Sequence, residues 1–143
     1  MEDKPIVYRL KQASRLCNET VKRLIRKNGI SSTYFYILNY IIKHPNDMIA
    51  QKDICFYLNM KPSTISVALQ KMELDELILR KRDEADTRKM QILLTSKGKA
   101  EALEYRKIYK QADQILLGAI SDSELKLLYE LLDKLSLAME EVL

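Results

Sequence analysis

Apolar residues recur at every third or fourth position near the start of the chain, which is the spacing of one face of a helix. Gly29 follows Asn28 and can supply the left-handed residue with which many helices end. We therefore predict one long amphipathic helix with a single buried stripe. Between about residues 4 and 28 this stripe consists of Ile6, Val7, Leu10, Ala13, Cys17, Val21, Leu24 and Ile25.

Three shorter segments with helical spacing follow in the middle of the chain. The first can be capped by Ser31 or Ser32 and ends before Pro45. A short helix is predicted from about residue 51 to 58, and Pro62 suits the first position of the next helix. The residues that this last helix buries are Ile65, Leu69 and Met72. A short helix, a tight turn and a helix with small polar residues on its outer face are typical of a helix-turn-helix.

The last third of the chain predicts a hairpin followed by two more helices. Two short apolar-edged runs flank residues 80–89, which carry eight charges in ten residues. Thr95 can cap a helix from 96 to about 118, and Ser121 with Glu124 has the form of a capping box that opens a final helix. Apolar residues lie off the main stripe of that final helix: Leu127, Leu131 and Leu137. A helix that is apolar almost all round needs more partners than one small domain supplies.

This last feature predicts that the helices at both ends of the chain pack against a second copy. A helix fully buried within a monomer is the alternative. The fold class we expect is mostly α with a small β wing, a winged helix-turn-helix flanked by N- and C-terminal dimerisation helices. In this single chain of 143 residues, we expect residues 31–95 to form the winged-helix DNA-binding lobe. Residues 1–30 and 96–143 are expected to supply the dimerisation helices.

The charge is distributed unevenly along the chain, and this suggests a polyanionic partner. The net charge is +4, but residues 121–143 hold six acids and only two bases, so the rest of the chain is strongly basic. Cys17 and Cys55 are far apart and form no zinc motif, and we expect no cofactor and no metal. Without an apolar run of about 20 residues or a signal-peptide start, we expect a soluble cytoplasmic protein.

The order of these elements and several short motifs resemble the MarR family of winged-helix transcriptional regulators over nearly the whole chain. The motifs are Pro62-Ser63-Thr64-Ile65-Ser66, Leu77-Ile78-Leu79-Arg80, Asp83-Glu84-Ala85-Asp86-Thr87-Arg88 and Ile92-Leu93-Leu94-Thr95-Ser96-Lys97-Gly98. The Asp-x-Arg motif between two strands, closed by Leu-Thr-x-x-Gly, is the most specific part. Each motif alone is weak, whereas the ordered set at these spacings is strong.

The resemblance implies a triangular homodimer that binds double-stranded DNA with two winged-helix lobes. It implies that Arg88 enters the minor groove and that Asp86 holds its guanidinium. This agrees with the physical expectation that a narrow minor groove attracts arginine and that a carboxylate can orient the planar fork. Two residues depart from the family pattern: Val67 stands in place of the usual Arg, and Glu76 in place of the usual Gly after the recognition helix. Glu76 predicts that this helix ends without a left-handed residue.

The helix that begins at Pro62 is the predicted recognition helix, whose N-terminal residues meet base edges and phosphates. Serine and threonine hydroxyls can hydrogen-bond to base edges or to phosphates. Gln70 can pair with adenine, and Val67 can touch a thymine methyl group. The predicted DNA-binding residues are Lys61, Pro62, Ser63, Thr64, Ser66, Val67, Gln70, Lys71, Arg80, Arg82, Asp86, Arg88 and Lys89.

No combination of residues indicates an enzyme, because His44 is the single histidine and no Ser-His-acid set accompanies it. We therefore predict a sequence-specific DNA-binding regulator, by default a repressor, on a pseudo-palindromic operator. Members of the resembling family often bind small phenolic or other apolar anionic effectors, for which the tyrosines Tyr8, Tyr34, Tyr36 and Tyr40 are candidates. Two alternatives remain open: a thiol-based redox sensor acting through Cys17, and a winged-helix module that binds protein and no DNA.

Overall fold

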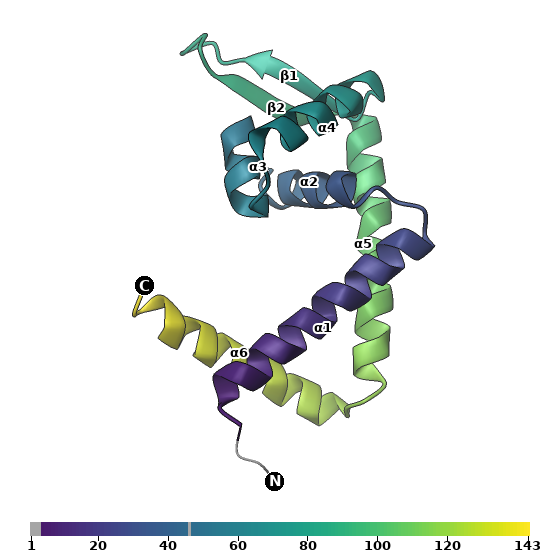
Figure 1. Ribbon diagram of the computed structural model, residues 1–143, viewed down its shortest axis with the longest axis vertical. Coiled ribbons are helices and arrows are strands. Elements are labelled where there is room, and N and C mark those ends of the chain that lie inside the picture. The colour runs from purple at the N-terminus through teal and green to yellow at the C-terminus, as the bar shows by residue number, and fades with distance from the viewer. Residues whose placement is uncertain (1–3, 46) are drawn as a thin grey trace.

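Three short helices and a hairpin form a lobe at one end of the molecule, and three longer helices extend from it (Figure 1). The computed structural model describes residues 4–45 and 47–143. The elements in chain order are α1 (Ile6–Lys27), α2 (Ser32–Lys43), α3 (Gln51–Leu58), α4 (Pro62–Leu74), β1 (Ile78–Arg82), β2 (Met90–Leu94), α5 (Ser96–Leu117) and α6 (Asp122–Glu140). The predicted fold class, mostly helical with a small β wing, is confirmed.

The predicted caps begin three of the helices. The Ser31 side chain accepts the Tyr34 backbone N–H at the start of α2, and Thr95 Oγ1 accepts the Gly98 N–H at 2.9 Å at the start of α5. At α6, Ser121 and Glu124 bond reciprocally as a capping box. These bonds satisfy backbone donors that a helix N-terminus leaves without a partner, so local sequence decides where these elements begin.

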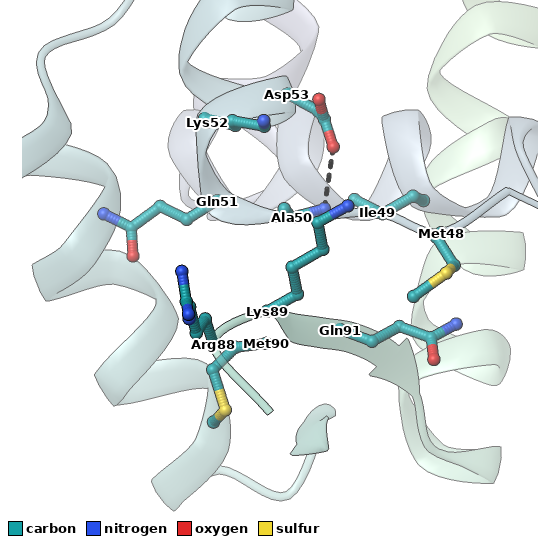
Figure 2. Close-up of a pocket in the computed structure, with 10 residues that line it drawn as sticks. All are labelled: Met48, Ile49, Ala50, Gln51, Lys52, Asp53, Arg88, Lys89, Met90 and Gln91. Carbon is teal, nitrogen blue, oxygen red and sulfur yellow. Dashed lines mark hydrogen bonds between the residues drawn. The ribbon is translucent and has the colours of Figure 1, made fainter. Parts of the chain in front are cut away.

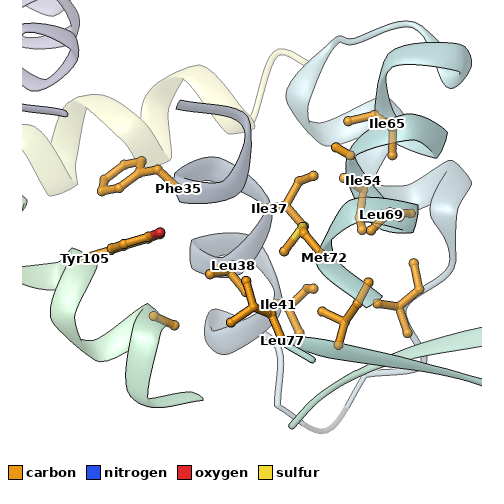
Figure 3. Packing of buried hydrophobic residues seen from close by; sticks show 14 of the residues in the cluster. Phe35, Ile37, Leu38, Ile41, Ile54, Ile65, Leu69, Met72, Leu77 and Tyr105 are labelled. Atoms are coloured by element: carbon orange, nitrogen blue, oxygen red, sulfur yellow. The ribbon is translucent and has the colours of Figure 1, made fainter. Parts of the chain in front are cut away.

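The core lies between α2, α3, α4, the wing and one face of α5 (Figure 3). Phe35 and Leu38 of α2 are fully buried and lie between the lobe and α5, while Ile54 of α3 packs with the buried face of α4. The α4 side chains in this core are Ile65, Ala68, Leu69 and Met72, three of which were predicted. Tyr105 of α5 is also buried and stacks on Phe35, with 5.9 Å between ring centroids. The lobe and α5 are therefore one packed unit.

The hairpin of β1 and β2 is antiparallel, with Ile78 opposite Leu94 and Arg82 opposite Met90. Ile78 and Ile92 point into the core and are almost fully buried, which fixes the register of the two strands. The other edge of β2 is held by the Ile92 N–H, which donates to the Ile49 carbonyl at 2.8 Å. Both edges of β2 are thus hydrogen-bonded, one to β1 and the other to Ile49.

The helices at the two ends of the chain bury little within it. Ile25 is the one buried residue of α1, and none of the α6 residues, all of which are described, is buried. The predicted burial of the α1 stripe is confirmed at its C-terminal end, where Ile25 is buried and Val21 and Leu24 pack against the core. It is wrong for the N-terminal part of the stripe, where Ile6, Val7 and Cys17 are exposed in the single chain. Within the described part of the sequence, no helix is both long and apolar enough to cross a membrane.

The expectation that α4 ends without a left-handed residue is wrong. Glu76 adopts φ +59°, and the Glu76 and Leu77 N–H groups donate back to the Glu73 and Met72 carbonyls. This is the arrangement of a Schellman motif, whose left-handed position is usually glycine. The backbone geometry is thus retained here with a residue that has a Cβ, at a cost of about 1–2 kcal/mol.

A Glu76→Gly variant is expected to unfold about 2–4 °C higher than the wild type. Glycine removes the left-handed strain but loses part of the gain to greater freedom in the unfolded chain, which leaves about 0.5–1 kcal/mol. Thermal unfolding at one fixed protein concentration measures this. Asn59→Gly is the matched control, because Asn59 also has a positive φ, +50°, but asparagine tolerates that region, so little change is expected. A lower melting temperature for Glu76→Gly would contradict the strain argument.

Candidate nucleic-acid interface

The outer face of α4 carries small and polar side chains in a row. Pro62 occupies the first turn, and Ile65, Ala68, Leu69 and Met72 bind the opposite face to the core. The predicted contact residues Lys61, Pro62, Ser63, Thr64, Val67, Gln70 and Lys71 are exposed, and Ser66 is half-buried. The helix is also braced from α3, where Gln51 Nε2 donates to the Pro62 carbonyl at 3.3 Å. Such a face can enter a major groove without disturbing the core.

Short-range bonds shape the tip of the wing. The Asp83 N–H donates to the Lys89 carbonyl at 2.9 Å, and the Lys89 N–H donates to the Asp86 carbonyl at 3.0 Å. Arg82 reaches across the loop and donates from Nη1 to the Thr87 carbonyl at 3.1 Å. The loop is therefore a closed turn that presents its side chains outward.

Asp86 holds Arg88 by a different atom from the one expected. The Asp86 Oδ1 accepts the backbone N–H of Arg88 at 3.1 Å, and the ion pairs within the described residues do not join Asp86 to the Arg88 guanidinium. The expected brace on the guanidinium is absent among these ion pairs, and the carboxylate instead accepts an N–H as in an Asx turn. Asp86 thus orders the backbone at Arg88, and the guanidinium remains available to contact a phosphate or a base edge.

The Arg88 side chain lies over a cavity of about 510 Å³ between the start of β2, next to the wing tip, and the start of α3 (Figure 2). Met48 and Met90 contribute apolar surface, while Lys52 and Lys89 add positive charge to its rim. The one nearby carboxylate, Asp53, is bound to the Ala50 N–H at 2.8 Å. The sequence alone did not indicate that Lys52 lines the same cavity as Arg88, because 36 residues separate them and only the folded lobe brings them to one cavity.

Arg80 has a different position from the other predicted wing residues. Its Nε forms an ion pair with Glu73 of α4, and only 21% of its side chain is exposed. This pair joins the wing to the recognition helix, so Arg80 is directed to α4 and not to the wing tip. The exposed wing cations are Lys81, Arg82, Arg88 and Lys89.

The four tyrosines considered as an effector site are dispersed. Tyr8 lies exposed on α1 next to Lys4, and Tyr34 donates to Asp75 Oδ2 at 3.0 Å. Tyr36 packs edge-on against Phe35, and Tyr40 stacks with His44 and Tyr57 at the other end of α2. The structure does not bring them together in one cavity. Burial raises the pKa of Tyr34, Tyr36 and Tyr40 above the usual value, so these hydroxyls stay protonated near neutral pH.

A long apolar groove of about 890 Å³ runs between α1 and α6. Val7, Leu10 and Cys17 line it from α1, and Leu128, Leu132, Leu135 and Met139 line it from α6. Each of these α6 leucines keeps between 37% and 44% of its surface exposed. Cys17 is a free and exposed thiol in this groove, and Cys55 is a half-buried thiol that packs against the core. Part of the apolar surface that α1 and α6 leave exposed thus forms one continuous surface, which we call the α1–α6 groove. The α6 residues off the main stripe, Leu127, Leu131 and Leu137, are exposed outside this groove.

Comparisons with known proteins agree with this arrangement. A family model described as the MarR family matches residues 28–89. A transcriptional regulator of helix-turn-helix type from Clostridium symbiosum, BilQ, is 28% identical over 119 residues, which are 83% of this chain and 81% of BilQ.

Solved structures extend the likeness to almost the full chain. A MarR transcriptional regulator from Methanosarcina mazei is 25% identical with a TM-score of 0.71, covering 96% of this chain and 98% of its own. The Staphylococcus aureus MepR–DNA complex is 24% identical with a TM-score of 0.68, covering 96% and 99%. At that identity the MepR likeness is one of fold.

A recognition helix followed by a two-stranded wing, on a lobe of three short helices, defines a winged helix-turn-helix protein. Within this class, the lobe matches the model of one family. The solved structures share the fold of α1, α5 and α6 as well as that of the lobe. Residues 28–89 match the MarR family, and nearly the whole chain shares the fold of MarR-family transcriptional regulators.

Proposed function

We propose that this protein regulates transcription as a homodimer that reads a pseudo-palindromic operator. In each lobe, α4 enters a major groove and the wing places Arg88 in the adjacent minor groove. The observation that carries the proposal is the exposure of both elements side by side on a lobe whose opposite faces are buried. MepR, a protein of the same fold, has been crystallised with DNA.

The individual contacts follow from side-chain chemistry. Ser63, Thr64 and Gln70 hydrogen-bond base edges or phosphates, and Val67 packs against a thymine methyl group. Lys61, Lys71 and the exposed wing cations meet phosphates, which positions the lobe without specifying sequence. Lys52, which lines the same cavity as Arg88, joins this set. Arg80 acts indirectly, because its pair with Glu73 fixes the wing relative to α4.

The second subunit binds in the α1–α6 groove. An exposed apolar surface of this extent is unusual for a monomer, and two-fold pairing of end helices covers both copies at once. Two lobes related by two-fold symmetry require half-sites about one helical turn apart. Blocking of promoter access, with release by a small effector, is the mode of regulation that we propose. The Staphylococcus aureus MepR and a Mycobacterium tuberculosis MarR-family protein have been crystallised with ethidium and with salicylic acid, respectively.

Selection of bound DNA from a random pool, followed by gel shift across a salt series, tests this function. A DNA reader loses affinity steeply with salt because it releases counterions from each phosphate that it contacts. The selected sequences should show two-fold symmetry. A winged-helix module that binds an acidic protein would enrich no sequence, and that result would reject the proposal.

An Arg88→Ala variant is expected to bind the selected operator about 5- to 150-fold more weakly, which corresponds to about 1–3 kcal/mol. The loss should be largest for operators with a narrow, A·T-rich minor groove beside each half-site. Fluorescence anisotropy at constant salt measures both effects. Arg106→Ala, an exposed arginine on α5, is the control that removes equal charge. Equal affinities of the two variants would show that the wing does not read DNA through Arg88.

A further inference from the structure

Asp75, which ends the recognition helix, is bound by side chains from two other elements. The Tyr34 hydroxyl of α2 donates to Asp75 Oδ2 at 3.0 Å, and Lys97 Nζ of α5 donates to the Asp75 carbonyl at 2.8 Å. The pKa of Tyr34 is raised, mainly by burial and then by its bond to Asp75, so this hydroxyl remains a donor across the physiological pH range. The end of α4 is therefore bound both to α2 and to α5.

The next two residues, Glu76 and Leu77, are held by the start of α5. Thr95 Oγ1 donates to the Glu76 carbonyl at 2.6 Å and lies 3.1 Å from the Leu77 carbonyl. The Thr95 N–H also donates to the Leu77 carbonyl at 3.1 Å. We call residues 75–77 the α4–β1 turn. Its left-handed residue, Glu76, is strained, and strain of this kind persists only where the surroundings hold the backbone in place.

The α4–β1 turn joins the three parts of the molecule that matter for DNA reading. It is the covalent link from the recognition helix to the wing, and its bonds lead to α5, which continues to the corner with α6 (Figure 1). The core contacts of α4 fix its place in the lobe. The polar bonds at Asp75 restrain its C-terminal end in addition, and they bind that end to α2 and α5.

We propose that Tyr34 and Lys97 are positioning residues that set the angle of the recognition helix relative to α5 and thereby the half-site spacing that the dimer accepts. This inference rests on the proposed function, because spacing has meaning only for two lobes on one operator. Neither side chain needs to touch DNA. Their loss should broaden the range of accepted spacings and leave non-specific binding unchanged.

The test is a set of operators whose half-sites are moved apart or together in steps of one base pair, with affinity measured for each. For the wild type we expect one clear optimum. Tyr34→Phe removes only the hydroxyl, and it should reduce the ratio of affinity at the optimum to that at the neighbouring spacing about 3- to 10-fold, the range of one net hydrogen bond. Tyr36→Phe, which removes a hydroxyl from the same helix away from the turn, should leave the ratio unchanged.

A pair of variants at the acceptor distinguishes positioning from a loss of stability. Asp75→Asn keeps an oxygen that can accept from Tyr34 and should behave as the wild type, whereas Asp75→Ala should resemble Tyr34→Phe. Adding Tyr34→Phe to Asp75→Ala should change the ratio no further, because the bond is already gone. An unchanged ratio in Tyr34→Phe would overturn this inference alone. A wild-type protein without any spacing optimum would overturn the proposed dimeric reader, and the inference with it.

Discussion

A Leu132→Glu variant is expected to be monomeric and to bind the operator at least about 100-fold more weakly than the wild type. Leu132 lines the α1–α6 groove, so a carboxylate there would have to lose its water when a second copy binds. A single lobe then holds one half-site, without the gain in affinity that comes from linking two binding sites. Sedimentation measures the mass of the variant, and gel shift measures its affinity.

The winged-helix lobe itself should stay folded, since Leu132 belongs to none of its buried core. Lys126→Glu introduces the same side chain on the same helix at a position that does not line the groove, and it should remain dimeric. If Leu132→Glu formed dimers as tightly as this control, the second subunit would have to bind elsewhere. The assignment of the α1–α6 groove would then be wrong even if DNA binding persisted.

The second large effect is expected at Gly98, near the start of α5. A Cβ at this position would lie 1.9 Å from the Leu77 carbonyl oxygen, and that atom is backbone, so it cannot turn aside. Gly98→Ala should therefore destabilise the fold by about 3 kcal/mol or more, at the upper end of what overpacking costs. Denaturant unfolding, analysed with a slope shared between variants, measures the loss.

Gly118→Ala is the matched control for this measurement. A Cβ there would meet its nearest atoms at 3.6 Å, which is ordinary contact, and the backbone at Gly118 is right-handed helical. Alanine should therefore be neutral or stabilising by up to about 1 kcal/mol. If Gly98→Ala were as stable as Gly118→Ala, the close approach of α5 to the α4–β1 turn would not be a feature of the folded protein.

The Gly98 contact also gives a physical reason for the Leu-Thr-x-x-Gly motif that carried part of the family resemblance. Thr95 caps α5 and bonds to the turn after the recognition helix, while Gly98 lets the two backbones meet. The motif is therefore a joint between the DNA-reading lobe and the long helices. A sequence motif can be recognised without this explanation, but only the folded chain shows what each of its residues touches.

The sequence by itself determined the local structure of this protein. Capping residues such as Ser31, Thr95 and Ser121 mark helix starts because they satisfy backbone donors within three residues, and such short-range bonds are visible in a linear sequence. The two short apolar-edged runs that flank the charged residues 80–89 likewise predict the hairpin of the wing. The residues on the two faces of α4 were predicted for the same reason, since helical periodicity separates its core face from its exposed face.

Only the tertiary structure decided which distant groups meet. It paired Arg80 with Glu73, dispersed the four tyrosines and brought Lys52 and Arg88 to one cavity. It also held Glu76 in a left-handed conformation that local preference disfavours. Periodicity says which face of a helix is apolar but not what covers that face, because the cover depends on how separate helices cross. For that reason the whole stripe on α1 was predicted as buried, although within one chain its N-terminal part lies open along a groove.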